Sequence, residues 1–200
     1  MVIGVILAAG ASTRMGRPKA LLPIGADTFV VRLARAFIAA GIDDLVVVTG
    51  PERDAIDSAL AVARIAARVV ENPRRERGQL SSLHVGLALA DKPGVVAVVV
   101  GLVDVPLVSA LTIGAVVEAY RRTHAPIVRP VCGARHGHPV LFARTVFDEL
   151  RHADPALGAK AVVRAHEHDL VNVPVDDAGA CVDIDTPGDY ASLIGSASGT

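Results

Sequence analysis

Residues 7–19 read LAAGASTRMGRPK and directly follow a short β-branched run at residues 2–7. An apolar run of this length that ends in Ala-Ala-Gly predicts a buried parallel strand followed by a tight loop. Ligands of open α/β sheets bind at the carboxyl ends of strands, where this loop lies. Its small residues let backbone N–H groups approach an anion, and it carries Arg14, Arg17 and Lys19 with no acid. The segment predicts a phosphate site, with a solvated basic loop as the alternative, although it matches neither the Walker A nor the GxGxxG spacing.

Outward from this loop, strand and helix patterns alternate along the chain. Beyond the first strand, the expected strands are residues 45–49, 68–71 and 95–100, and the expected helices are residues 27–40, 51–66, 80–89 and 109–122. This alternation predicts a three-layer α/β fold, Rossmann-like, with a mostly parallel sheet and helices on both faces.

The last third of the chain is expected to depart from this alternation. Strands at 126–131 and 139–142 flank a hairpin at 133–138, and helices are expected from Arg144 and over 155–166. Short strands at 170–175 and 181–184 precede a final helix from Thr186 to about Ile194. No linker divides the chain, so we expect one domain over residues 1–195 and a frayed tail at 196–200.

Composition excludes several classes of protein. Of the 200 residues, 52% are hydrophobic and 20% charged, which excludes a disordered chain. Aromatic residues reach only 3%, and 20 Lys and Arg balance 21 Asp and Glu, so no nucleic-acid surface is expected. The longest apolar run, 95–103, is too short for a bilayer span of about 20 residues, so no membrane role is expected.

The two cysteines, Cys132 and Cys181, are isolated and have no CxxC spacing. This pattern predicts free thiols in a reducing cytosol rather than a disulfide or a zinc site. The amino terminus has no basic segment before its apolar run, so no targeting peptide is expected. Together these features predict a cytoplasmic protein.

Five segments, in order, carry a resemblance to a known family. The loop at 7–19 resembles the signature loop of nucleotidyltransferases that activate sugars, alditols and cofactors. Residues 71–83 resemble an NPxxxxGxxSSL segment, 104–106 (Asp-Val-Pro) a DxP turn, 137–139 a GHP segment and 183–187 a DIDTP ending. The chain therefore resembles the MobA-like NTP transferases, and within them the cytidylyltransferases of molybdenum cofactor maturation. It departs from the family at Val103, where Gly is frequent, and at Val105, where Gln or Met is common.

Asp104 is the first expected metal ligand. It follows the most hydrophobic strand, and a carboxylate at the end of a buried strand is costly without a partner. Mg²⁺ is a hard cation that prefers such oxygens, and the resemblance supports this assignment over a simple turn aspartate. The resemblance also implies Asp185 as a second ligand of Mg²⁺ and a structural role for Asp183. The alternative for Asp185 is the N-cap of the last helix.

The resemblance further implies the residues of a nucleotide site. Arg14 and Lys19 are expected to hold the triphosphate and, with Asp104, to be catalytic. The base and ribose are expected to contact the backbone at the start of the loop and the segment that opens the helix near residue 80. These nucleotide-binding residues are Leu7, Ala8, Ala9, Gly10, Gly78, Ser81 and Ser82, the serines having N-capping as their alternative. His138 is expected on the acceptor side.

The resemblance implies a Mg-dependent nucleotidyltransferase that uses an NTP, with CTP favoured, and releases pyrophosphate. The expected acceptor is molybdopterin, whose phosphate attacks the α-phosphorus, so no Ser/His/Asp or Cys/His nucleophile is needed. A molybdoenzyme or its maturation chaperone is a possible partner. The alternatives are a sugar- or alditol-phosphate nucleotidyltransferase and a non-catalytic cofactor-binding or chaperone module, the last suggested only by Val103.

Overall fold

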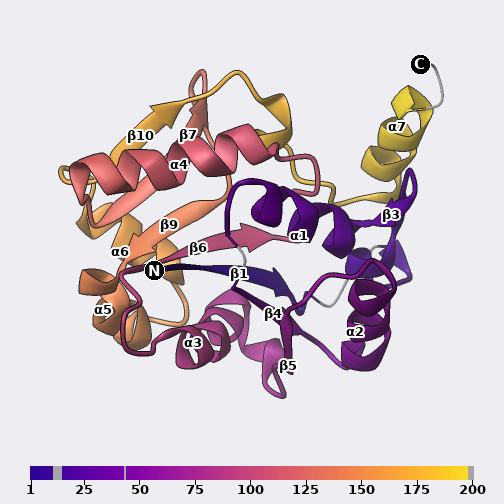
Figure 1. Ribbon diagram of the computed structural model, residues 1–200, viewed down its shortest axis with the longest axis horizontal. Helices are drawn as coiled ribbons and strands as arrows, with labels where there is room; N and C mark the ends of the chain where they lie inside the picture. The colour runs from indigo at the N-terminus through magenta and orange to yellow at the C-terminus, as the bar shows by residue number, and fades with distance from the viewer. Residues whose placement is uncertain (11–14, 43, 198–200) are drawn as a thin grey trace.

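A mixed sheet forms the centre of the molecule, shown in Figure 1 as a computed structural model that describes residues 1–10, 15–42 and 44–197. The strand order is β10-β7-β9-β6-β1-β4-β5, and the short β8 pairs with β7. The strands are β1 (Val2–Ala8), β4 (Leu45–Thr49), β5 (Arg68–Glu71), β6 (Ala97–Leu102), β7 (Ile127–Cys132), β8 (Arg135–His136), β9 (Val140–Ala143) and β10 (Val171–Pro174).

The parallel core of the sheet is built around β1. Gly4 of β1 lies opposite Leu45 of β4 and Val99 of β6, both in parallel register. β9 joins antiparallel to β6, with Val98 opposite Phe142, and extends the sheet toward β7 and β10. The predicted three-layer α/β fold with a mostly parallel sheet is therefore confirmed.

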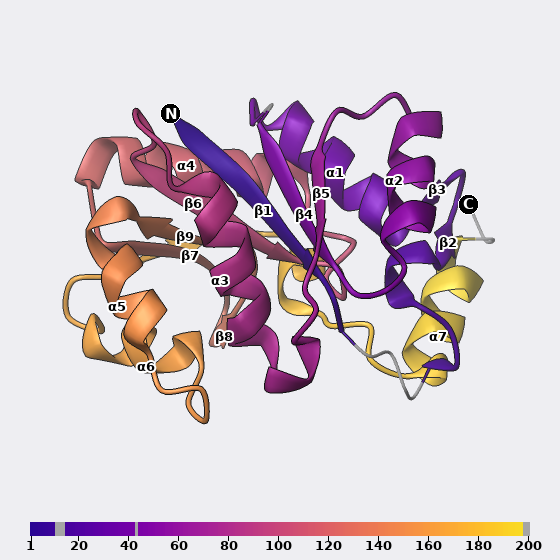
Figure 2. The same cartoon turned by 90° about the horizontal axis from the view of Figure 1, so that it is seen from below.

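Helices cover both faces of the sheet (Figures 1 and 2). One core cluster packs α1 (Phe29–Ala39), α2 (Arg53–Val62) and α4 (Ala110–Thr123) on one face, and the other packs α3 (Gln79–Ala90), α5 (Phe147–His152) and α6 (Ala159–Ala165) on the opposite face. A Cβ atom at Gly4 would lie 2.7 Å from Cδ1 of Phe37, and one at Gly101 would lie 2.9 Å from Cε2 of the same ring. The two glycines therefore let α1 pack closely against β1 and β6.

Several expected boundaries were wrong. The first helix begins at Phe29, because β2 (Pro23–Ile24) and β3 (Asp27–Thr28) form a small hairpin before it. The helix expected over 155–166 begins at Ala159, after Gly158 takes a φ of +65°. The strand expected over 181–184 is absent among the described residues, since a short 3-10 helix, η5 (Ala178–Cys181), ends there. The last helix, α7, spans Pro187–Ala197.

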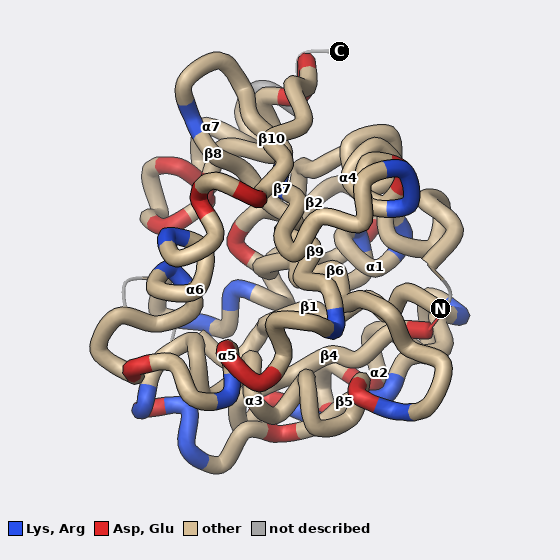
Figure 3. The backbone as a smooth tube through the Cα atoms, turned by 90° about the vertical axis from the view of Figure 1, so that its left-hand side faces the viewer, with Lys and Arg blue, Asp and Glu red and all other residues tan. Residues whose placement is uncertain are grey.

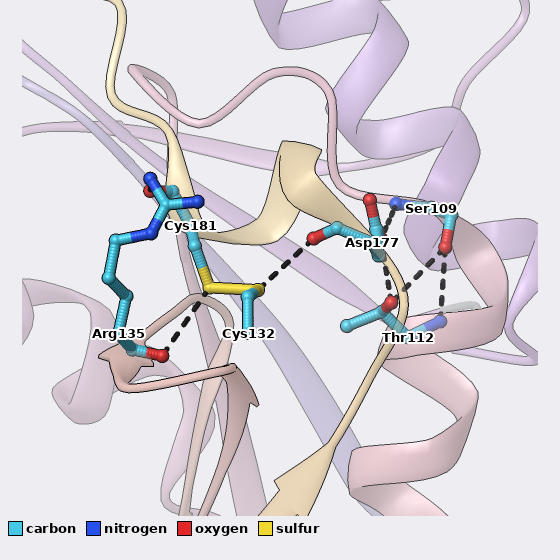
Figure 4. Close-up of a disulfide and its surroundings, with 6 residues drawn as sticks. All are labelled: Ser109, Thr112, Cys132, Arg135, Asp177 and Cys181. Carbon is cyan, nitrogen blue, oxygen red and sulfur yellow. Dashed lines mark hydrogen bonds between the residues drawn. A yellow bond between two sulfur atoms is a disulfide. The ribbon is translucent and has the colours of Figure 1, made fainter.

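Cys132 and Cys181 form a disulfide (Figure 4), so the prediction of free thiols was wrong. The two residues are 49 positions apart, but β7 and η5 bring their Cα atoms to 6.4 Å. Spacing along the chain could not show this, because the contact depends on the fold. The cysteines therefore give no support to a cytoplasmic location, which stays a prediction.

Asp177 fixes the other end of η5 (Figure 4). Its Oδ2 accepts hydrogen bonds from the backbone N–H of Ser109, at 2.9 Å, and from the hydroxyl of Thr112, at 2.6 Å. Ser109 caps α4, as expected, by accepting from the backbone N–H of Thr112. The segment that leads to Asp183 is thus attached both to α4 and to β7. Within the described residues, none of the helices combines the length and apolarity that crossing a bilayer requires.

Candidate active site

Three segments meet at the carboxyl edge of the sheet. Lys19 begins the short 3-10 helix η2 (Lys19–Leu21), Asp104 follows β6, and Asp185 follows η5. Nζ of Lys19 donates to Oδ1 of Asp185 at 2.5 Å, across 166 positions of sequence. The backbone N–H of Ile184 donates to the carbonyl of Asp104 at 2.7 Å. The structure therefore brings together three residues that the sequence singled out.

The carboxylate of Asp104 is the least satisfied of these groups. Its Oδ1 is buried and has no hydrogen-bond partner among the described residues. Burial raises the pKa of Asp104 to about 6, an effect that Lys19 opposes and that the charges of Asp183 and Asp185 reinforce. A buried oxygen of this kind is costly unless a further partner pairs with it.

The apolar neighbours of Asp104 explain its burial. Val103 and Val105 are both packed in the core, and the backbone N–H of Val103 donates to the carbonyl of Leu7 at 3.1 Å. The backbone of Val103 therefore ties the turn to the end of β1, and the side chains of Val103 and Val105 pack in the core beside it. They leave the carboxylate of Asp104 at the edge of the sheet.

The donor chemistry of this edge fits a hard divalent cation such as Mg²⁺. Within the described ranges, no three His, Cys, Asp or Glu side chains form a metal site by themselves. The protein would contribute the carboxylates of Asp104 and Asp185, and phosphate oxygens and water would complete the shell. This division is usual for Mg²⁺, which is commonly held by one or two carboxylates together with substrate phosphates.

The loop that begins the site is only partly described. Leu7, Ala8 and Ala9 are buried where β1 ends, and Gly10 is exposed. Arg14 lies outside the described residues, so its expected contact with phosphate stays a prediction. On the far side of the loop, the guanidinium of Arg17 lies 5.9 Å from the ring centroid of Tyr190 in α7.

The segment that opens α3 is held by a buried amide. Asn72 is 3% exposed, and its Nδ2 donates to the hydroxyls of Ser81, at 2.8 Å, and of Ser82, at 3.0 Å. The Ser81 hydroxyl donates in turn toward the carbonyls of Gly78 and Arg74. Neither serine caps the helix, since Gly78 occupies that position with a φ of +87°. Asn72 was not among the expected site residues, although it lies in the segment 71–83 that resembles the family's NPxxxxGxxSSL motif.

A cavity of about 760 Å³ opens beside this edge. It reaches from Leu7 and Gln79 to His138 and Asp183, under the sheet. Its apolar wall comes from α3, β6, β9 and the region around α6, and consists of Leu80, Leu83, Val100, Leu102, Val140, Phe142, Val163 and Leu170. A volume of this order suits a small organic ligand, since such pockets commonly measure about 300–1,000 Å³.

His138 lies in the wall of this cavity, and its place on the acceptor side stays a prediction. Its Nδ1 is buried and has no hydrogen-bond partner among the described residues. Burial lowers the pKa of His138, while the charge of Asp183 opposes that shift, so the ring is neutral at pH 7. A Cβ atom at Gly137 would lie 2.5 Å from the carbonyl oxygen of Ala180, so only glycine lets this turn pass so close to η5.

Five charged residues line the cavity, and sequence reasoning gave a role only to Asp183; the others are Arg129, Lys160, Arg164 and Glu167. Asp183 was expected to be structural, but it is exposed and lines the cavity. No local motif marks the three cations, and only the packing of α6 beneath the sheet brings them to the same space.

Sequence comparison identifies similar proteins over most of the chain. The profile of the MobA-like NTP transferase domain matches residues 4–170. A probable molybdenum cofactor guanylyltransferase of Mycolicibacterium paratuberculosis is 27% identical over 194 residues, which cover 95% of this chain and 93% of that protein. Nicotine blue oxidoreductase of Paenarthrobacter nicotinovorans is 37% identical over 122 residues, or 60% of this chain, and the match spans only 57% of that protein.

Structural comparison agrees with the sequence matches. Rv0371c of Mycobacterium tuberculosis H37Rv is 32% identical, with a TM-score of 0.83 and coverage of 97% of both chains. A structure of Rv0371c in complex with manganese is similar at a TM-score of 0.79, with 31% identity and 98% coverage of each chain.

Proposed function

The chain belongs to the MobA-like NTP transferase family, and from this premise we propose that it transfers a nucleoside monophosphate from an NTP to a phosphorylated acceptor. Molybdopterin is the proposed acceptor and CTP the favoured donor. The observation that carries this proposal is the cluster of Lys19, Asp104 and Asp185 beside the cavity. A cation and two carboxylates at the carboxyl edge suit a triphosphate with its metal ion.

The proposed reaction is an in-line displacement. An oxygen of the acceptor phosphate forms a bond to the α-phosphorus, the bond from that phosphorus to the bridging oxygen breaks, and pyrophosphate leaves. Because the acceptor is already an oxyanion, no side chain has to remove a proton. The protein contributes position and charge neutralisation, which Lys19 and the proposed Arg14 supply at the phosphates.

Asp104 and Asp185 are the proposed ligands of the divalent cation. Mg²⁺ would supply charge neutralisation at the phosphates when bound. The structure of Rv0371c in complex with manganese supports the binding of a divalent cation by a protein of this fold, although the ion there is manganese and not magnesium. In this chain, Oδ1 of Asp104 is buried without a hydrogen-bond partner among the described residues, which also supports cation binding by Asp104.

The choice of base rests on the resemblance to cytidylyltransferases. Cytosine presents an amino donor beside a ring-nitrogen acceptor, which the backbone near Leu7 and Ala8 and the segment from Gly78 to Ser82 could meet. GTP is the second candidate, because the relative from Mycolicibacterium paratuberculosis is named a guanylyltransferase. We propose that CTP exceeds GTP and UTP by at least about tenfold in kcat/KM, which corresponds to about 1.4 kcal/mol.

The acceptor pocket favours a ring over a polyol. Its walls are largely aliphatic, with Phe142 as an aromatic member, and His138 offers one unpaired ring nitrogen. Val103 was the only feature that suggested a non-catalytic module. We disfavour that alternative, because Val103 packs in the core and its backbone N–H donates to Leu7 at the turn that contains Asp104.

The test is pyrophosphate release by the purified protein, with molybdopterin as acceptor and equimolar CTP, GTP, UTP and ATP in competition. The proposal predicts release that requires both molybdopterin and a divalent cation, with the cytidylyl product dominant. A dominant guanylyl product would overturn the choice of base and leave the reaction intact. No release with any NTP, from protein shown to be folded, would contradict the proposed reaction.

A further inference from the structure

One end of the cavity is lined by the cations Lys160, Arg164 and Arg129, with the acid Glu167 among them. α6 contributes Lys160 and Arg164, which are one helical turn apart and both line the cavity. Figure 2 shows α6 and α7 at opposite ends of the molecule, with α3 between them. Residues that lie four apart on a helix are neighbours on its surface, so the two charges belong to one patch.

Neither cation has a hydrogen bond or an ion pair within the part of the chain that the structure describes. The other charged residues of the cavity have interactions of their own. Arg129 donates to the side chain of Asn172 at 2.8 Å and contacts Nε2 of His136 at 2.9 Å, and the charge of Glu167 acts on this same arginine. Lys160 and Arg164 are both exposed, so their charges are open to an anion that enters the cavity.

The helix that carries the pair is firmly attached. Val162 is 5% exposed, and Nε2 of His166 lies 2.8 Å from Oε2 of Glu149 in α5. Lys160 and His138 both line this cavity. Figure 3, in which Lys and Arg are blue, shows positive segments on α6.

A histidine in the same cavity is a second feature that indicates a ligand site. His138 lines the cavity, and its Nδ1 is buried and has no hydrogen-bond partner among the described residues. Unsatisfied groups of this kind are rare in folded proteins and call for a ligand or an ordered water. The cavity therefore combines apolar side chains, one buried ring nitrogen and the two cations of α6, and it extends to Asp183 near the carboxyl edge of the sheet.

From this arrangement we infer that Lys160 and Arg164 form an anion subsite for a second acidic group of the acceptor, remote from its reacting phosphate. The inference rests on the proposed function for the identity of the ligand as acceptor. It adds a substrate class: an organic phosphate whose ring or apolar body separates the phosphate from another anionic group. Arg164 can bind two oxygens of that group at once, and Lys160 adds a compact charge.

A matched pair of dyes tests the subsite without turnover. Anilinonaphthalene sulfonate carries a ring body and an anion, and phenylnaphthylamine has the same rings without the sulfonate. Fluorescence titration compares wild type, the double variant Lys160→Ala/Arg164→Ala, and the control Arg121→Ala/Arg122→Ala on the opposite face of the sheet. We expect the cavity variant to bind the sulfonate about tenfold more weakly, with the neutral dye and the control unchanged.

Equal weakening of both dyes would show that the variant damages the cavity, and would overturn the inference, as would no change in either. Failure of the sulfonate dye to bind wild type would overturn it as well.

A second measurement separates this inference from the proposed function. With molybdopterin as acceptor, the cavity variant should show an acceptor KM raised about tenfold and an NTP KM unchanged. If wild type turns over but the acceptor KM does not move, the subsite fails and the proposed function stands. If no NTP is turned over while the sulfonate discrimination holds, the anion subsite stands and the proposed function fails.

Discussion

Asp44 and Asp104 lie at opposite ends of the same sheet and have opposite surroundings. Asp44 directly precedes β4, where its two oxygens accept from Arg68 at 2.7 Å and from Lys92 at 2.8 Å. The hydrogen bond from Lys92 is the largest cause of a pKa below the usual range for this carboxyl, with burial opposing it and Arg68 adding to it. Asp104 follows β6, has a buried oxygen without a partner in the described chain, and has a raised pKa.

This contrast separates a carboxylate that stabilises the fold, at the amino end of the sheet, from one that we propose to be functional, at the carboxyl end. At the amino end, the chain supplies both partners of the carboxylate, so the charge stabilises the folded state. At the carboxyl end, one oxygen of a carboxylate is buried with no hydrogen-bond partner in the described part of the chain, and we propose that a ligand binds it. Changes at Asp104 and Lys19 can therefore be compared with matched changes at Asp44 and Lys92.

The largest expected effect is on turnover. Asp104→Asn should lower kcat by about 10²–10³ while the fold is retained, because a group that acts on charge in the transition state is lost. Asp44→Asn, the control, should leave kcat within twofold. Pyrophosphate release by the two variants, with circular dichroism as a check of folding, measures the difference. Activity of the Asp104 variant within threefold of wild type would remove it from the site.

Lys19 is the second comparison. Lys19→Ala should weaken NTP binding and slow turnover together, since its charge would act on the phosphates in both the bound and the transition state. Lys19→Arg should restore only part of the loss, because a planar guanidinium does not replace a compact ammonium. Lys92→Ala at the other end should leave both kinetic constants unchanged. Normal NTP affinity in Lys19→Ala would sink the phosphate role.

The third prediction concerns stability against pH in the absence of divalent cations. The folded state raises the pKa of Asp104 from 3.8 to about 6, so it binds this proton more tightly than the unfolded chain does. The associated stability is therefore complete below pH 3.8 and is lost as the pH rises through about 6. Asp104→Asn, which cannot ionise, should be more stable than wild type at pH 8 by up to about 3 kcal/mol, at about 1.4 kcal/mol per pKa unit.

Urea unfolding at pH 4 and pH 8 measures this change, and the advantage of the Asn variant should nearly vanish at pH 4. A variant that is less stable than wild type at pH 8 would show that Asp104 is paired within the protein. That outcome would remove the contrast between the two ends.

The smallest effect is expected for Asp44→Asn, with the opposite sign. A lowered pKa means that the ionised carboxylate stabilises the fold above its unfolded pKa, and that this contribution is lost as the pH falls. Since the ion pairs are partly exposed, the cost at pH 7 should be only about 1 kcal/mol. Thermal unfolding at pH 7 and pH 3 should show the variant less stable at pH 7 and nearly equal to wild type at pH 3.

The two ends also differ in how far sequence reasoning could reach. The rule that ligands bind at the carboxyl ends of parallel strands placed Lys19 and Asp104 together, because the loop that contains Lys19 and the turn that contains Asp104 each follow a strongly apolar strand. Asp185 needed the family resemblance, since the strand expected just before it does not form. The place of Asp183 in the cavity could not be predicted for the same reason, as the path of residues 181–185 depends on η5, and its structural role stays a prediction.

Contacts between distant segments were beyond the reach of local patterns. The disulfide joins residues 49 positions apart, and the cations of α6 line the cavity only because this helix packs beneath the sheet. The hairpin of β2 and β3 was missed because its strands are two residues long, too short for a period to be seen. The features that sequence alone predicted are those set by strand order and by loops next to strands.

The central claim is that the carboxyl edge is completed by a cation and a nucleotide, and Mn²⁺ binding tests it most directly. Electron paramagnetic resonance of Mn²⁺ in the presence of CTP, or of GTP if that is the donor, should count protein-bound ion for wild type, Asp44→Asn and Asp104→Asn. The account predicts equal binding by wild type and Asp44→Asn, and at least about tenfold weaker binding by Asp104→Asn. Equal Mn²⁺ binding by all three folded proteins would contradict it.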